Sequence, residues 1–191
     1  MIYLIGSLRN PKVPEVAKRL REEGHEVFDD WFSAGEFADD YWRDYEKARG
    51  HNLKQALEGW AAQHVFEFDT THLKRADTRV MVMPAGKSCH LELGWGLGQG
   101  KRGYILFDEE PERFDFMLLF ATGVFYSLDD LVGELKNGRR GDEGDRSDYR
   151  WGEGVKARNV FVNSKRGLVG TGRTLWQRLQ EVCKSKLGAW L

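Results

Sequence analysis

The chain has 191 residues, 41% of them hydrophobic and 31% charged, which suits one globular domain with room for an appended segment. A net charge of -1 gives no overall basic field for duplex DNA or a membrane surface, and no stretch is apolar for long enough to predict a membrane span. Cys89 and Cys183 lack metal-ligand spacing, and the N-terminal residues lack signal-peptide features. We therefore expect a cytoplasmic protein without a metal or a cofactor.

The first elements along the chain form a βαβ unit. Residues 2–5 are an apolar run ending at Gly6, which predicts a buried strand that opens into a turn. After Pro11, apolar residues recur at the helical spacing i, i+3, i+4, i+7, and Gly24 is positioned to end that helix. Residues 25–28 then predict a second strand.

The segment 29–66 combines acidic residues with a group of aromatic ones. Its spacing predicts helices over residues 39–49 and 53–65. The aromatic residues fit either core packing, which we favour, or a lid that stacks on a planar base. The members of this group are Trp31, Phe32, Phe37, Tyr41, Trp42 and Tyr45.

From residue 66 onward, helices and strands alternate again. We expect strands at 78–83, 103–107 and 123–126, and helices over 66–76, over 90–100 and after the capping residue Ser127. The glycines within 90–100 indicate a close approach of the backbone to a neighbouring group. This order predicts an α/β fold, a flavodoxin- or Rossmann-like doubly wound parallel five-stranded sheet, for residues 1–136. Residues 137–150 predict a charged, glycine-rich linker or loop.

Residues 151–191 form a predicted C-terminal extension in which three tryptophans alternate with basic residues. This composition is compatible with nucleic-acid binding, but we favour docking onto the domain or onto a partner subunit.

In a doubly wound sheet the ligand lies at the carboxyl ends of the strands, so the loops after the first and third strands should form the site. The first loop carries Gly6, Ser7 and Arg9, and its simpler interpretation is a tight turn with a capping serine. Glu92 lies near the start of the following helix among leucines, where the helix dipole should keep it ionised as a nucleophile. A structural interpretation of Glu92 is that it pairs with an arginine. Asp69 lies on the helix before the third strand, and its structural interpretation is a solvated surface acid.

Three motifs occur in order: I-G-S-L-R at 5–9, F-D-x-x-x-L-x-x-A-D at 68–77 and S-x-x-x-E-L-G-W-G at 88–96. Together they resemble the nucleoside 2-deoxyribosyltransferase superfamily, which includes the deoxynucleoside 5′-monophosphate N-glycosidases, over about residues 1–136. The resemblance implies that Glu92 is the nucleophile, that Asp69 protonates the leaving base or holds the sugar, and that the active protein is a homodimer. The expected substrate-binding residues are Gly6, Ser7, Arg9, Asp30, Gly86, Lys87 and Ser88.

The predicted function is therefore cleavage or transfer of the N-glycosidic bond of (deoxy)nucleosides or their 5′-monophosphates through a glutamyl-sugar intermediate. Deoxyribosyltransferases often have an aspartate in the loop before the nucleophile, but residues 84–88 contain no acid. This departure weighs against base exchange, although the sequence does not decide between hydrolysis and transfer. Arg9 and Lys87 favour a phosphate-bearing substrate. The alternatives are a NAD glycohydrolase and a nucleotide-binding module without catalysis.

Overall fold

The computed structural model describes residues 1–141 of the chain. The predicted extension at 151–191, and the predicted linker from residue 142 onward, lie outside the described residues. No helix within the described part combines the length and the apolar character needed to cross a membrane.

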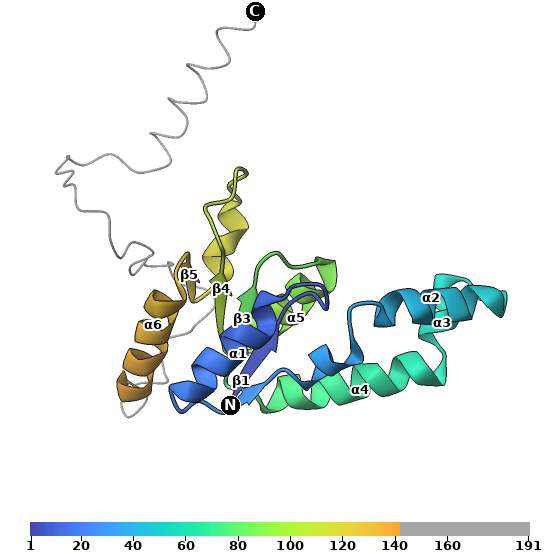
Figure 1. Ribbon diagram of the computed structural model, residues 1–191, viewed down its shortest axis with the longest axis horizontal. Coiled ribbons are helices and arrows are strands. Elements are labelled where there is room, and N and C mark those ends of the chain that lie inside the picture. The colour runs from blue at the N-terminus through green and yellow to red at the C-terminus, as the bar shows by residue number, and fades with distance from the viewer. Residues whose placement is uncertain (142–191) are drawn as a thin grey trace, which may run out of the picture. The chain divides into compact units, whose positions relative to one another are not determined.

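A five-stranded sheet, parallel throughout, forms the centre of the described chain (Figure 1). Its order is β2-β1-β3-β4-β5, the arrangement of flavodoxin-like doubly wound folds, in which the sequence order reverses beside β1. This confirms the predicted fold class. The strands are β1 (Ile2–Ile5), β2 (Val27–Phe28), β3 (Thr78–Val82), β4 (Arg102–Leu106) and β5 (Gly123–Phe125).

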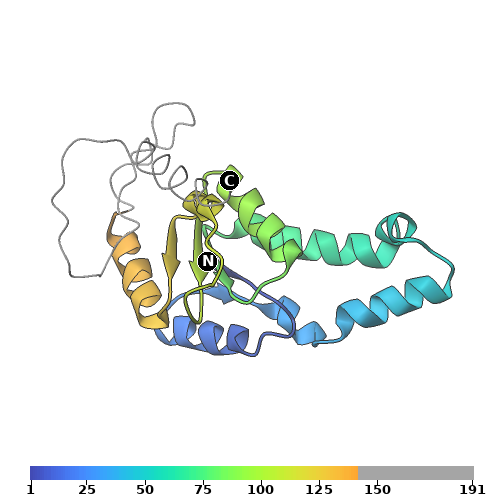
Figure 2. The ribbon, with the colours of Figure 1, turned by 90° about the horizontal axis from the view of Figure 1, so that it is seen from above.

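Helices cover both faces of the sheet, because the strand residues alternate between two apolar clusters. Helices α1 (Lys12–Glu22) and α6 (Leu128–Gly141) pack on one face, and α4 (Trp60–Arg75) and α5 (Lys87–Gly98) on the other (Figure 2). On β1, Leu4 points to the α1 face, whereas Tyr3 and Ile5 point to the α5 face. Tyr3 and Ile5 therefore lie beneath the two helices that carry the predicted catalytic acids.

The chain between β2 and α4 forms a helical excursion beyond the sheet. A 3-10 helix, η1 (Asp30–Ala34), leads into α2 (Ala38–Ala48) and then α3 (Leu53–Leu57). Trp31 anchors the start of this excursion, since its indole Nε1 donates to the Leu4 carbonyl at 2.9 Å and its ring packs against both apolar clusters. We call residues 38–57 the arm; the views in Figures 1 and 2 both place it beside the N-terminal part of α4.

Several element boundaries differ from the prediction. The second strand is shorter, because only Val27 and Phe28 pair with β1. The helix expected over 53–65 is two helices. The capping box of Asn52 and Gln55 starts α3 at the expected residue, but α3 ends at Leu57 and the extended Gly59 precedes α4. A 3-10 helix, η2 (Phe116–Phe120), was not predicted, and α6 continues past residue 136 to Gly141.

Among the glycines of α5, Gly96 has the close neighbour that the glycine-rich sequence predicted. A Cβ at Gly96 would overlap the side chain of Arg79, which lies fully buried on β3. The Arg79 guanidinium donates from Nη2 to the Leu73 carbonyl at the end of α4. At Gly94 and Gly98 a Cβ would meet open space, so the predicted close approach is confirmed at Gly96 alone of these three.

Candidate functional site

The loops after β1 and β3 meet, as expected for the carboxyl edge of a doubly wound sheet. They line an open surface cavity of about 210 Å³. The residues that line it are Ser7, Arg9 and Asn10 from the first loop and Pro84, Ala85 and Gly86 from the second. Three of the predicted substrate-binding residues, Ser7, Arg9 and Gly86, are thus brought together at one cavity.

Asn10 joins the two loops, a role that the sequence did not reveal. Its side chain is almost fully buried, at 4% exposure. The amide Nδ2 donates to the carbonyls of Val82 at 3.3 Å and Pro84 at 3.4 Å, while Oδ1 accepts from the backbone N–H of Lys12 at 3.0 Å. An Asn before Pro is a general turn signal, and it does not specify that the amide will cross to another loop.

Gly6 and Ser7 shape the first loop. A Cβ at Gly6 would lie 2.6 Å from Cγ2 of Val13, so a glycine is needed for α1 to pack this close to the turn. The hydroxyl of Ser7 accepts from the backbone N–H of Arg9 at 3.2 Å. The simpler interpretation of this serine, a local turn, therefore describes the structure and also fixes the backbone of Arg9 at the cavity.

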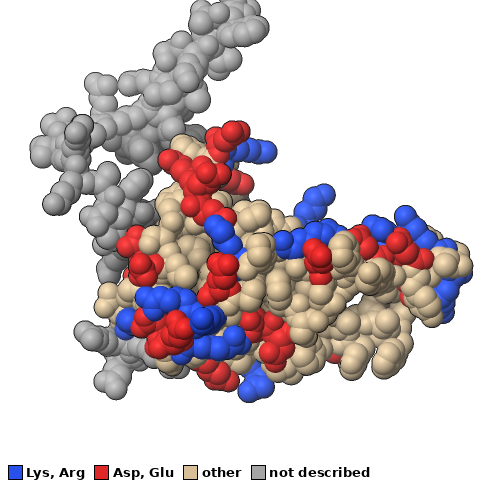
Figure 3. Space-filling model, viewed as in Figure 1, with Lys and Arg blue, Asp and Glu red and all other residues tan. Residues whose placement is uncertain are grey.

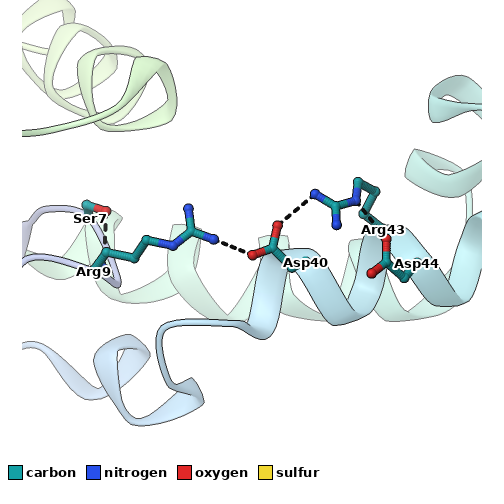
Figure 4. Close-up of polar contacts among 5 residues, drawn as sticks. All are labelled: Ser7, Arg9, Asp40, Arg43 and Asp44. Atoms are coloured by element: carbon teal, nitrogen blue, oxygen red, sulfur yellow. Dashed lines mark hydrogen bonds and ion pairs between the residues drawn. The ribbon is translucent and has the colours of Figure 1, made fainter.

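The Arg9 side chain reaches out of the loop toward the arm. Its guanidinium forms an ion pair with Asp40 on α2 (Figure 4). Asp40 was missed by sequence analysis, because its place beside Arg9 depends on how the arm folds back. The cation expected to face a substrate phosphate thus already has an internal anionic partner.

Glu92 and Asp69 come from the adjacent helices α5 and α4 on one face of the sheet. Burial is the main cause that raises the pKa of Glu92 from 4.5 to about 7, and the negative charge of Asp69 raises it further. Burial likewise raises the pKa of Asp69, while the nearby His72 acts to lower it. Oδ1 of Asp69 is buried without a hydrogen-bond partner, and no hydrogen bond or ion pair engages Glu92 within residues 1–141.

The expectation that the helix dipole keeps Glu92 ionised is therefore wrong. Glu92 lies in the second turn of α5, which begins at Lys87, and the dipole effect is confined to the first turn. Desolvation and a like charge both favour the neutral acid, and here they dominate. The alternative of an arginine partner for Glu92 is also not what the structure shows, since no such ion pair is formed in the described chain.

Tyr3 completes this cluster and was not singled out from the sequence, where it reads as one more strand residue. Burial raises the pKa of its hydroxyl, and the charges of Glu92 and Asp69 raise it further. The ring stacks on Phe28 at 5.2 Å, and Phe28 in turn stacks on His72 at 3.9 Å. A tyrosine within an otherwise aliphatic strand is the signal that could have pointed to it.

The remaining predicted residues lie nearer the surface. Lys87 and Ser88 are exposed in the first turn of α5. Asp30 is exposed at the start of η1, where its backbone carbonyl accepts from Ser33 Oγ at 2.7 Å. No hydrogen bond joins the Asp30 side chain to another predicted site residue among those described.

The charged surface gives no sign of an extended basic face on the side seen in Figure 3, where Lys and Arg alternate with Asp and Glu. Within residues 1–141, no group of three or more His, Cys, Asp or Glu side chains is placed to hold a metal ion. The cluster of Glu92, Asp69 and Tyr3 brings together two carboxyl groups and a phenol. Paired carboxyl groups of this kind can serve as nucleophile and proton donor.

No protein-family model matches the chain, and no curated protein matches it. A solved structure similar to it is a 2-deoxyribosyltransferase from the psychrotolerant bacterium Bacillus psychrosaccharolyticus. The TM-score is 0.46 and the identity 21%, with 69% of this chain and 89% of that chain covered. At this level of similarity, the function has to be argued from the side chains of the site.

Proposed function

We propose that the protein cleaves or exchanges the N-glycosidic bond of (deoxy)nucleosides or their 5′-monophosphates, with Glu92 as the nucleophile. The observation that carries the proposal is the half-buried carboxyl group of Glu92, without a partner in the described chain and beside Asp69. A fold stabilised only by packing gains nothing from two acids placed together away from solvent, because burial desolvates both charges and the two negative charges repel each other. Perturbed acids of this kind cluster at catalytic sites.

The proposed reaction has two steps. The carboxylate of Glu92 attacks C1′ of the sugar, the bond between C1′ and the base nitrogen breaks, and the base leaves with a proton from Asp69. Water or a second base then attacks C1′ and releases Glu92, and Asp69 regains a proton from the attacking group. An anion beside C1′ stabilises the oxocarbenium character of both transition states, and two displacements give overall retention.

The acid pair supplies the one proton that this mechanism uses. The reaction requires one ionised and one protonated carboxyl group at the same time. Burial raises the pKa of Asp69 and, to about 7, that of Glu92, and the repulsion between them favours a state with a single negative charge. In the singly ionised pair Glu92 holds the proton, since its pKa is raised to about 7 by burial and by the charge of Asp69, and transfer of that proton to Asp69 gives the reactive form with Glu92 ionised.

The cavity between the two loops supports the choice of substrate. Ser7, Arg9 and Gly86 line it, and the exposed Lys87 and Ser88 follow in the first turn of α5. Backbone N–H groups at a helix start, together with a guanidinium, suit the hydroxyl or phosphate groups of a nucleotide. We therefore assign these residues to the sugar and 5′-phosphate side of the substrate.

Chromatography of free base tests the proposal. The purified protein is incubated with a panel of ribo- and deoxynucleosides, their 5′-monophosphates and NAD, with and without an acceptor base. We expect base release from at least one nucleoside or monophosphate, and loss of that release in Glu92→Ala. Glu67→Ala, which removes an exposed acid from α4, should leave the rate unchanged. Full activity in Glu92→Ala would remove the nucleophile assignment, and release of nicotinamide alone would favour a NAD glycohydrolase.

We also propose that the protein is a homodimer. Large apolar side chains are exposed on both helices of the catalytic face: Trp60, Val65 and Phe66 on α4, and Leu91 and Trp95 on α5. Large exposed apolar side chains on two adjacent helices favour an interface with a second copy of the chain. Sedimentation analysis should give twice the mass of one chain, and Phe66→Glu should shift the protein toward the monomer; a monomer across the micromolar range would contradict this.

A further inference from the structure

Arg9 belongs to a chain of four alternating charges that links the cavity to the arm. Its guanidinium pairs with one carboxylate oxygen of Asp40. The other oxygen of Asp40 accepts from Nη1 of Arg43 at 2.7 Å, and Nε of Arg43 donates to Asp44 at 2.8 Å (Figure 4). Asp40 is thus shared between two arginines, only one of which lines the cavity.

We propose that Asp40 is an internal competitor for the substrate's anionic group at Arg9, and that it sets how strongly the site prefers a 5′-phosphate over an uncharged nucleoside. This inference rests on the proposed function, because it names a specificity residue of that same site. The competing ligand is a phosphate monoester of the substrate.

The geometry makes the exchange feasible. Arg9 is the single charged residue among those that line the cavity of the described chain, and 57% of its side chain is exposed. Its backbone is held by the hydroxyl of Ser7, so the guanidinium can turn from α2 toward the cavity without a change in the loop. A phosphate dianion offers more negative charge and the same bidentate geometry as a carboxylate.

Asp40 keeps Arg43 as a partner when the Arg9 side chain turns toward the cavity. Arg43 stays bonded to it from the same helix, so the carboxylate, which is 30% exposed, is not abandoned when Arg9 turns away. The nearby Lys12 cannot take over the role of Arg9 without losing its own partner, since its Nζ pairs with Asp108 at 2.6 Å. Asp40 and the incoming phosphate therefore compete for one group, the Arg9 guanidinium.

Two substitutions on α2 separate direct competition from a general change of charge. Asp40→Asn frees Arg9, whereas Asp44→Asn removes the same charge from the same helix but touches only Arg43. Isothermal titration calorimetry with inorganic phosphate measures binding without catalysis. Asp40→Asn should tighten phosphate binding by about three- to tenfold, the range expected for the loss of one partly exposed ion pair. Asp44→Asn should change it by less than about twofold.

A third variant and the kinetics complete the test. Arg43→Gln leaves Asp40 with Arg9 as its only partner in this network and should weaken phosphate binding. In Asp40→Asn, the KM for the monophosphate should fall while that for the matching nucleoside stays unchanged. Equal tightening in Asp44→Asn, no change in Asp40→Asn, or no phosphate binding by any variant would each overturn the inference. The proposed function is judged separately, by base release from uncharged nucleosides that depends on Glu92.

Discussion

Replacing Glu92 with glutamine should stabilise the fold at high pH while it abolishes the activity. The pKa of Glu92 is raised in the folded protein from 4.5 to about 7, chiefly by burial and also by the charge of Asp69. The folded state therefore binds this proton more tightly than the unfolded state does. Between these two pH values, stability falls as pH rises, because ionisation is easier in the unfolded chain. Glutamine resembles the neutral acid and has no such penalty.

The size of the effect follows from the shift. A difference between 4.5 and about 7 corresponds to at most about 3.5 kcal/mol, at about 1.4 kcal/mol for each pH unit. Glu92 is not fully buried, and solvent reduces the penalty, so we expect Glu92→Gln to be more stable than the wild type by about 1 to 3 kcal/mol at pH 8. The difference should be small below pH 4.5 and should level off above about pH 7.

Urea unfolding of both proteins at a series of pH values measures this difference, since titrations common to the two proteins cancel. In an Asp69→Asn background the gain should shrink but persist, because burial rather than Asp69 is the larger cause. A Glu92→Gln variant that is less stable at pH 8, or a gain that does not change with pH, would refute the reasoning. It would mean that the carboxyl group is neither desolvated nor coupled to its neighbour in solution.

Three further predictions concern the packing of α5 and the acid cluster. Gly96→Ala should lower the free energy of unfolding by about 1 to 3 kcal/mol, because the methyl group meets the buried Arg79. Gly94→Ala, with open space around it, should raise the free energy of unfolding by roughly 0.5 to 1 kcal/mol. Urea midpoints compare the two variants, and equal effects would contradict the contact between residue 96 and Arg79. Asp69→Asn should slow base release by ~10²–10⁴-fold and move the acidic limb of the kcat/KM profile, set by ionisation of Glu92, below about pH 7; an unmoved limb would show that the acids are uncoupled. Tyr3→Phe removes a hydroxyl whose pKa the charges of Glu92 and Asp69 raise, and it should slow base release by about tenfold or more with an unchanged circular dichroism spectrum; full activity would exclude the hydroxyl from the reaction.

The sheet was predictable because its strands are short apolar runs bounded by glycine, proline or charged residues. β1, β3, β4 and β5 all lie within one or two residues of their predicted bounds, since a buried parallel strand is apolar on both faces and is easily seen in sequence. The break between α3 and α4 was missed because the apolar spacing continues across it. Gly59, whose backbone is extended just before α4, is the local signal that marks the new start.

The candidate site was predictable to the extent that topology places it. The meeting of the two loops follows from the parallel strand order, and the cavity found there contains Ser7, Arg9 and Gly86. The partners Asn10, Asp40 and Tyr3 were missed, because each acts on residues distant in sequence. The ionisation of Glu92 was predicted wrongly for the same reason, since burial and the charge of a residue on another helix decide it.

The most direct test of the account is mass spectrometry of the protein quenched with acid during turnover of a nucleoside substrate. The account predicts a fraction of the protein heavier by one sugar residue, with the added mass on the peptide that contains Glu92, and no such species in Glu92→Ala. Base release by the wild-type protein with the sugar attached to a different side chain would contradict the central claim, as would base release that persists in Glu92→Ala.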